Sequence, residues 1–204
     1  MAPSPATPLS LPARLVLAAH ADRRLRSRMF RTELGYGAAG AALLELAAEE
    51  RISVSHEAIV VRDARRDADP VVDRVLGQLL FADRGRGPRR WVERLGPTVL
   101  DGTRDRLIAD GLLVPVRRRI LGVFPVRGDM PAGTPAAPDH AVVRLLDALR
   151  RPGAAFRPEC PGAPACPDAP GRADCPACPD RVDLVVPAVR AAVAAAALPF
   201  ACSG

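Results

Sequence analysis

The chain has 204 residues, enough for one domain with a large buried core, and only 3% of them are aromatic, so that core must be aliphatic. The net charge of +6 comes entirely from arginine, because the sequence contains no lysine, and it favours an acidic partner such as a lipid headgroup or a nucleic acid. The apolar runs fall short of the roughly 20 residues that a bilayer-spanning helix needs, and no secretory signal is recognisable, so we expect a soluble or peripheral protein.

The first half of the chain predicts packed helices. The expected elements are, in order, a flexible lead over residues 1–12, helices over 13–20 and 36–50, strands over 52–54 and 58–62, and a helix over 70–81. The helix over 36–50, here called the hub helix, is rich in glycine and alanine. Small residues let neighbouring backbones approach closely, so the hub helix is expected inside a bundle.

The second half predicts shorter helices, a hairpin and an irregular insertion. The expected elements are helices over 89–95 and 103–110, a hairpin over 112–126 with arginines 117–119 at its turn, a linker over 128–138 and a helix over 139–150. A Pro/Gly/Cys-rich insertion over 151–183 precedes a C-terminal helix and tail over 184–204. The predicted fold class is therefore mainly α, a single-domain helical bundle with a β-hairpin and an irregular Pro/Cys-rich insertion.

Several ordered blocks of sequence carry a family resemblance. They are Leu15-Val16-Leu17, the end of the hub helix with Arg51-Ile52, Asp69-Pro70-Val71-Val72-Asp73, the block 89–95 around Trp91, and 106–113 running into 119–125. Over about residues 11–150 the chain resembles the Golgi phosphoprotein 3 family, peripheral membrane proteins that recognise phosphatidylinositol 4-phosphate, and beyond residue 150 the likeness fades. The helical domain is thus expected over 13–150, and the Ala, Pro and Gly content indicates a bacterial member.

The resemblance also implies a lipid headgroup pocket, but the pocket residues differ here. Carried over by position, the family's tryptophan falls on Phe30, and its three arginines fall on Ala39 and near Pro97 and Leu100. Neighbouring arginines are expected to compensate, because guanidinium groups grip phosphates at two points. The predicted lipid-binding residues are Phe30, Arg31, Arg90, Arg104 and Arg118.

The predicted hairpin has two interpretations. On pattern alone it packs as an edge element on the core. In the family, a hairpin at this place contributes to membrane attachment and self-association, which implies that Ile120, Leu121 and Phe124 insert into the membrane while the arginines meet headgroups. A homo-oligomer through the hairpin is the corresponding expectation.

Four cysteines of the insertion, Cys160, Cys166, Cys175 and Cys178, have the spacing C-x5-C-x8-C-x2-C. Four thiolates are what a structural zinc requires, and a segment so poor in apolar residues would gain order from a metal. The first spacing is unlike a standard zinc knuckle, so free thiols in a loose insertion are the competing interpretation, and no cofactor is expected apart from this possible zinc.

The sequence contains no recognisable catalytic motif, so we expect no enzyme. The predicted function is a non-catalytic peripheral protein that binds anionic phospholipid, phosphatidylinositol 4-phosphate by resemblance, and acts as an adaptor at the cytoplasmic, inner face of a membrane. The alternative is a DNA-binding protein, because a helix over 103–110 followed by a basic hairpin is similar to a winged helix. Its short helix makes nucleic acid the less favoured partner.

Overall fold

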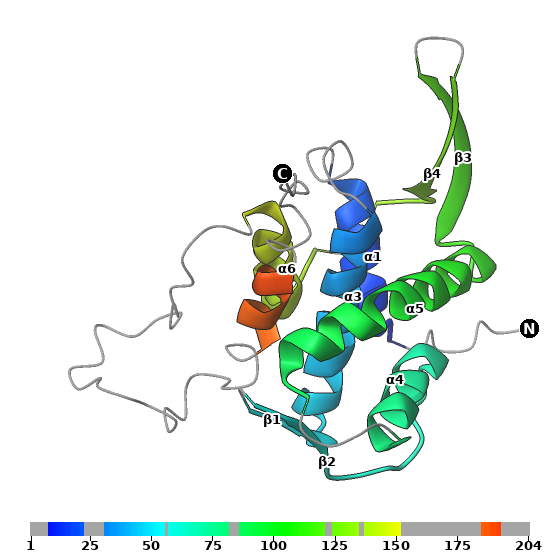
Figure 1. Cartoon of the computed structure of the whole chain (residues 1–204). Coiled ribbons are helices and arrows are strands. Elements are labelled where there is room, and N and C mark those ends of the chain that lie inside the picture. The colour runs from blue at the N-terminus through cyan, green and yellow to red at the C-terminus, as the bar shows by residue number, and fades with distance from the viewer. Residues whose placement is uncertain are drawn as a thin grey trace, which may run out of the picture.

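The computed structural model describes residues 8–22, 31–55, 57–81, 86–120, 124–134, 137–151 and 185–192, with backbone alone for 117–120 and 124–127. The helices are α1 (Leu11–Ala21), α3 (Arg31–Ala48), α4 (Pro70–Phe81), α5 (Pro88–Ala109), α6 (His140–Arg150) and a last helix over 185–192. The strands are β1 (Ile52–Val54), β2 (Ile59–Val61), β3 (Leu113–Ile120) and β4 (Phe124–Pro131), which form two antiparallel pairs. The predicted fold class, mainly α with a hairpin, is confirmed (Figure 1).

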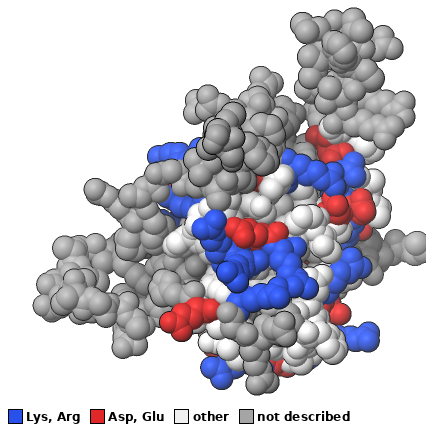
Figure 2. Space-filling view, viewed as in Figure 1, with Lys and Arg blue, Asp and Glu red and all other residues white. Residues whose placement is uncertain are grey.

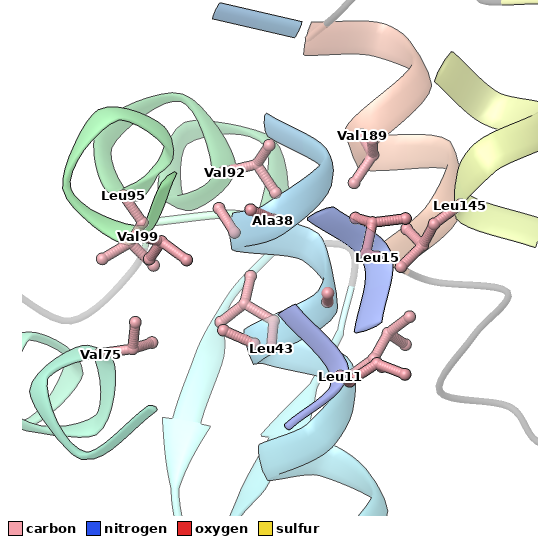
Figure 3. Close-up of a cluster of buried hydrophobic side chains, with 14 of the residues drawn as sticks. Leu11, Leu15, Ala38, Leu43, Val75, Val92, Leu95, Val99, Leu145 and Val189 are labelled. Atoms are coloured by element: carbon pink, nitrogen blue, oxygen red, sulfur yellow. The ribbon is translucent and has the colours of Figure 1, made fainter. Parts of the chain in front are cut away.

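The hub helix, predicted over 36–50, corresponds to the later part of α3, which spans Arg31–Ala48, and α1, α5 and α6 pack around α3. Small residues of α3 permit these contacts, as predicted for the hub helix. A Cβ atom added at Gly35 would lie 2.9 Å from the carbonyl oxygen of Gly96 in α5, and one at Gly40 would lie 2.3 Å from Val189 of the last helix. Figure 3 shows aliphatic side chains of α4 and α5 on one side of Ala38 and Leu43 of α3, and Leu15 of α1 beside Leu145 of α6 on the other.

One continuous helix replaces the two short helices predicted over 89–95 and 103–110. α5 runs for 22 residues through Pro97, so the prediction of two separate helices with a gap over 96–102 is wrong. Proline interrupts helical hydrogen bonding, but packing against a neighbouring helix can offset that cost. Here Gly96 lies against the backbone of Gly35 and the ring of Tyr36, which fixes the helix at the proline.

The hairpin is longer than predicted and its turn lies elsewhere. Pairing starts at Leu113 with Pro131 and continues without interruption to Ile120 with Phe124, so arginines 117–119 belong to strand β3 rather than to the turn. The predicted linker from residue 128 likewise begins too early, because β4 continues to Pro131. A run of like charges does not bar an extended backbone when the partner strand supplies the hydrogen bonds. The hairpin projects from the end of α5, away from the helices (Figure 1).

Candidate functional site

The outer face of α5 is the most arginine-rich surface that the structure describes on one element. The helix starts with Pro88 after Gly87, and it ends where Leu112 N–H donates to the Leu107 carbonyl and Gly111 takes a φ of +70°. This left-handed glycine closes the helix in a Schellman motif. Trp91, Leu95 and Val99 face the core, which leaves the opposite stripe to solvent.

The amino-terminal half of that stripe carries uncompensated positive charge. Arg89 pairs with Glu93 at 2.9 Å, whereas Arg90 and Arg94 are exposed and have no carboxylate partner among the described residues. Arg94 lies 5.9 Å from the centre of the Trp91 ring, within cation–π range. The first turn contains no acidic residue, although the helix dipole favours acids there. Figure 2 shows arginine side chains gathered over α5.

Two other arginines that were predicted to bind lipid instead form ion pairs with carboxylates. Arg31, at the start of α3, is paired with Asp101 of α5. Arg104 forms a bidentate pair with Asp129 of β4, with its Nε 2.5 Å and its Nη2 2.9 Å from the two carboxylate oxygens. The hydrogen bond from Arg104 to Asp129 raises the pKa of Arg104 above its ordinary value. This ion pair, here called the hairpin strut, fixes the base of the hairpin against α5.

The structure places the remaining predicted residues only in part. The backbone of β3 carries Arg118 opposite Val126, and Ile120 opposite Phe124 at the far end of the hairpin. Phe30, Leu121 and the four cysteines lie outside the described residues. Within the described ranges no group of three His, Cys, Asp or Glu side chains could hold a metal ion.

The positions onto which the resemblance carries the family's pocket arginines hold apolar residues that are mostly buried. Ala39 is fully buried in the hub helix and Leu100 is buried on the inner side of α5, while Pro97 is exposed. None of these three side chains carries a charge, so none of them supplies a cation. The arginines that remain near them, Arg31 and Arg104, are those engaged by Asp101 and Asp129.

A buried ionic cluster escaped the sequence analysis. Arg51 is 1% exposed, and its Nη1 lies 2.5 Å from Asp67 Oδ2. Asp69 accepts a hydrogen bond from the Val71 N–H at the start of α4, while Asp73 accepts one from the Asp67 N–H. The block 69–73 thus closes a loop over Arg51. In the sequence, the only indication of this cluster was the position of Arg51 between the apolar hub helix and an apolar strand.

Glu45 of the hub helix lies near the same cluster. Its carboxylate accepts a hydrogen bond from the Leu11 N–H at 2.9 Å, which joins α3 to the first residue of α1. Burial raises the pKa of Glu45 from 4.5 to about 7, and the nearby carboxylates of Asp67, Asp69 and Glu49 act in the same direction. The cluster is a structural centre, because Arg51 and Asp67 form a largely buried ion pair and Glu45 joins two helices.

Comparisons with known proteins identify the family. No helix in the described ranges is both long and apolar enough to cross a membrane. No curated protein matches the chain. The family model described as Golgi phosphoprotein 3 matches residues 11–198, so the likeness extends past residue 150, where it was expected to fade. Since this match covers most of the sequence, the chain belongs to the Golgi phosphoprotein 3 family.

Proposed function

We propose that this protein is a non-catalytic peripheral membrane protein that binds anionic phospholipid through the outer face of α5. Membership of the Golgi phosphoprotein 3 family suggests a non-catalytic lipid-binding role. The observation that carries the proposal is the pair Arg90 and Arg94, exposed one helical turn apart and without a described carboxylate partner. Like charges at this spacing repel each other, and an anionic surface would relieve that repulsion.

The hairpin supplies a second contact in this proposal. Each basic residue near an anionic membrane contributes about 1 kcal/mol, so a few arginines alone give weak, salt-sensitive attachment. Stable attachment usually needs an apolar contact as well. The backbones of Ile120 and Phe124 form the last described pair at the projecting end of the hairpin, and Arg118 precedes Ile120 by two residues in β3. Leu121 follows Ile120 in the sequence. Insertion of these three apolar residues would provide the apolar contact, and self-association through the hairpin belongs to the same proposal.

We expect little preference for phosphatidylinositol 4-phosphate over other acidic lipids. The family pocket positions lack their cations, and the carboxylates of Asp101 and Asp129 already occupy Arg31 and Arg104. A headgroup phosphate would have to compete with these carboxylates. The proposed location is the cytoplasmic face of a membrane, where anionic lipids are concentrated and where an adaptor would meet its protein partner.

Vesicle flotation tests the proposal. Vesicles of phosphatidylcholine alone, with phosphatidylglycerol, or with phosphatidylinositol 4-phosphate at equal surface charge are compared. The wild type should float with both acidic mixtures equally and not with the neutral one. The double change Arg90→Gln and Arg94→Gln should abolish most binding. Its matched control, Arg62→Gln and Arg66→Gln, removes the same charge from exposed arginines that also lack a described ion pair. Equal loss in both variants would contradict a specific role for α5.

The DNA-binding alternative is less well supported. Its proposed two-turn recognition helix is the end of the 22-residue helix α5. Its two basic side chains there, Arg104 and Arg106, are engaged with Asp129 and Asp69. Binding of the wild type to duplex DNA with the same affinity as to acidic vesicles would revive this alternative.

A further inference from the structure

The end of α4 exposes an aromatic side chain that the fold does not use. Phe81 is 93% exposed and its neighbour Leu80 is 44% exposed. Among the large apolar residues that the structure describes as exposed, Phe81 is by far the most accessible. An aromatic ring of this size contributes much of the hydrophobic free energy where it is buried, whether in cores or at interfaces.

The position of Phe81 on α4 explains its exposure. Val72, Val75 and Leu76 form the buried face of the helix. Arg74, Gly77 and Phe81 recur at helical spacing on the opposite face, where Arg74 is exposed and a Cβ atom added at Gly77 would meet nothing within 4 Å. The outer face of α4 thus carries the cation of Arg74, no side chain at Gly77 and the aromatic ring of Phe81.

The surrounding sequence is strongly cationic. From Arg74 to Trp91, both included, the chain carries five arginines and a single acid, Asp83. Arg74 has no ion pair in the described part of the chain, and neither has Arg90. The chain from Phe81 to Pro88 can span at most about 25 Å when fully extended. Phe81 is therefore close enough to the first turn of α5 for both to contact the same membrane surface.

We propose that Phe81, together with Leu80, inserts into the interface of an anionic bilayer next to the arginines of α4 and α5. This inference rests on the proposed function and adds an apolar anchor distinct from the hairpin. We infer an anionic bilayer as the partner of this surface from charge complementarity. Its acyl chains can take up the aromatic ring while its phosphates pair with the flanking arginines. The end of α4, with Leu80 and Phe81, then contacts the membrane together with the outer face of α5.

Fluorescence tests insertion directly. Trp91, 3% exposed, is the sole tryptophan of the chain, so Phe81→Trp adds one exposed fluorophore and the wild type serves as its background. On addition of phosphatidylglycerol vesicles, the added emission should shift to shorter wavelength and be quenched by lipids brominated near the headgroup end of the acyl chain. Emission that stays unchanged while the protein floats with the vesicles would overturn the inference and leave the proposed function standing.

A pair of matched substitutions tests the contribution to binding. Phe81→Ser should weaken flotation with phosphatidylglycerol vesicles several-fold, and Phe81→Leu should retain most of it. The control Val143→Ser removes an apolar side chain that is 44% exposed on α6 and should leave binding unchanged. Circular dichroism should show the same helicity in all variants, because Phe81 makes little contact with the fold.

Two other results would count against the anchor. If Phe81→Ser alters the molar mass in light scattering but leaves vesicle binding unchanged, the ring is a contact between copies of the chain and the inference is wrong. If the wild type fails to float with any acidic vesicle, the proposed function itself is wrong and the anchor is rejected with it.

Discussion

At the scale of single residues, the buried guanidinium of Arg51 joins two segments of the chain. Asp67 holds it at 2.5 Å, while Glu49 is 3.8 Å away and nearly half exposed. The Nε and Nη2 atoms of Arg51 have no hydrogen-bond partner in the described structure. Removing Asp67 would therefore leave a buried charge almost without compensation.

Asp67→Ala is expected to lower the free energy of unfolding by about 3–5 kcal/mol, because an uncompensated buried charge is strongly destabilising. Urea unfolding followed by circular dichroism measures this change. Asp63→Ala, which removes the partner of the exposed Arg65, is the control and should cost less than about 1 kcal/mol. Similar effects from the two substitutions would show that Arg51 does not depend on Asp67.

The raised pKa of Glu45 predicts a pH-dependent stability. The folded state retains a proton on Glu45 up to about pH 7, whereas the unfolded chain releases it near its ordinary pKa of 4.5. The stabilising contribution is thus complete below pH 4.5 and is lost as the pH rises through 7. Glu45→Gln should remove this dependence and raise stability at pH 8 by about 1–2 kcal/mol after allowance for solvent screening.

Unfolding midpoints between pH 4 and pH 8 check this prediction against the wild type. The amide oxygen of Gln can still accept the Leu11 N–H bond, so the contact between α1 and α3 should persist. The assignment would be contradicted if the wild-type stability did not fall over this pH range. It would also be contradicted if the Glu45→Gln variant lost as much stability as the wild type.

At the scale of elements, the crossing of α3 and α5 depends on two glycines in contact. A Cβ atom at Gly35 would lie 2.9 Å from the carbonyl oxygen of Gly96, and backbone cannot move aside as a flexible side chain can. Gly35→Ala should therefore lower the free energy of unfolding by about 1–3 kcal/mol, the usual cost of overpacking. Thermal and urea unfolding of the variant measure the loss.

Gly77→Ala is the matched control in α4, where an added Cβ atom meets nothing within 4 Å. Because alanine is the better helix former, this substitution should raise stability by about 0.5–1 kcal/mol. The opposite signs of the two changes separate helix propensity from packing. A stabilised Gly35→Ala variant would mean that α3 and α5 do not approach as closely as described.

The sequence predicts elements well where one helical period dominates and poorly where distant contacts decide. The apolar spacing of 70–81 and the composition of the hub helix sufficed to predict α4 and α3. The continuity of α5 through Pro97 was not predicted, because the contact of Gly96 with Gly35 joins residues 61 positions apart. The hairpin turn was misplaced because its position depends on the register that starts at Leu113 and Pro131.

At the scale of the whole molecule, the candidate site was predictable in its charge but not in its ion pairs. Arg31 and Arg104 were selected because they are cationic, but Asp101 and Asp129 lie 70 and 25 residues away in sequence. Leu80 fits the same apolar pattern as the core residues of α4, and only the packed structure separates the exposed tip from the buried face.

The hairpin strut predicts that membrane attachment depends on geometry as well as charge. Arg104 and Asp129 fix the hairpin base against α5, so the hairpin and the arginines of α5 can meet one surface together. Arg104→Lys keeps the charge but loses the bidentate pair, because an ammonium group cannot reproduce the planar fork of arginine. We expect it to weaken binding to phosphatidylglycerol vesicles several-fold and to increase protease cleavage within β3 and β4.

Arg89→Lys provides the comparison, because Arg89 pairs with Glu93 on the surface of the same helix and should tolerate lysine. Arg104→Gln, which removes both the charge and the fork, should bind no better than Arg104→Lys if geometry dominates. Wild-type binding by Arg104→Lys together with loss in Arg104→Gln would show instead that Arg104 acts through its charge alone. The strut would then be a stabilising contact without a part in membrane attachment, and the two contact surfaces would act independently.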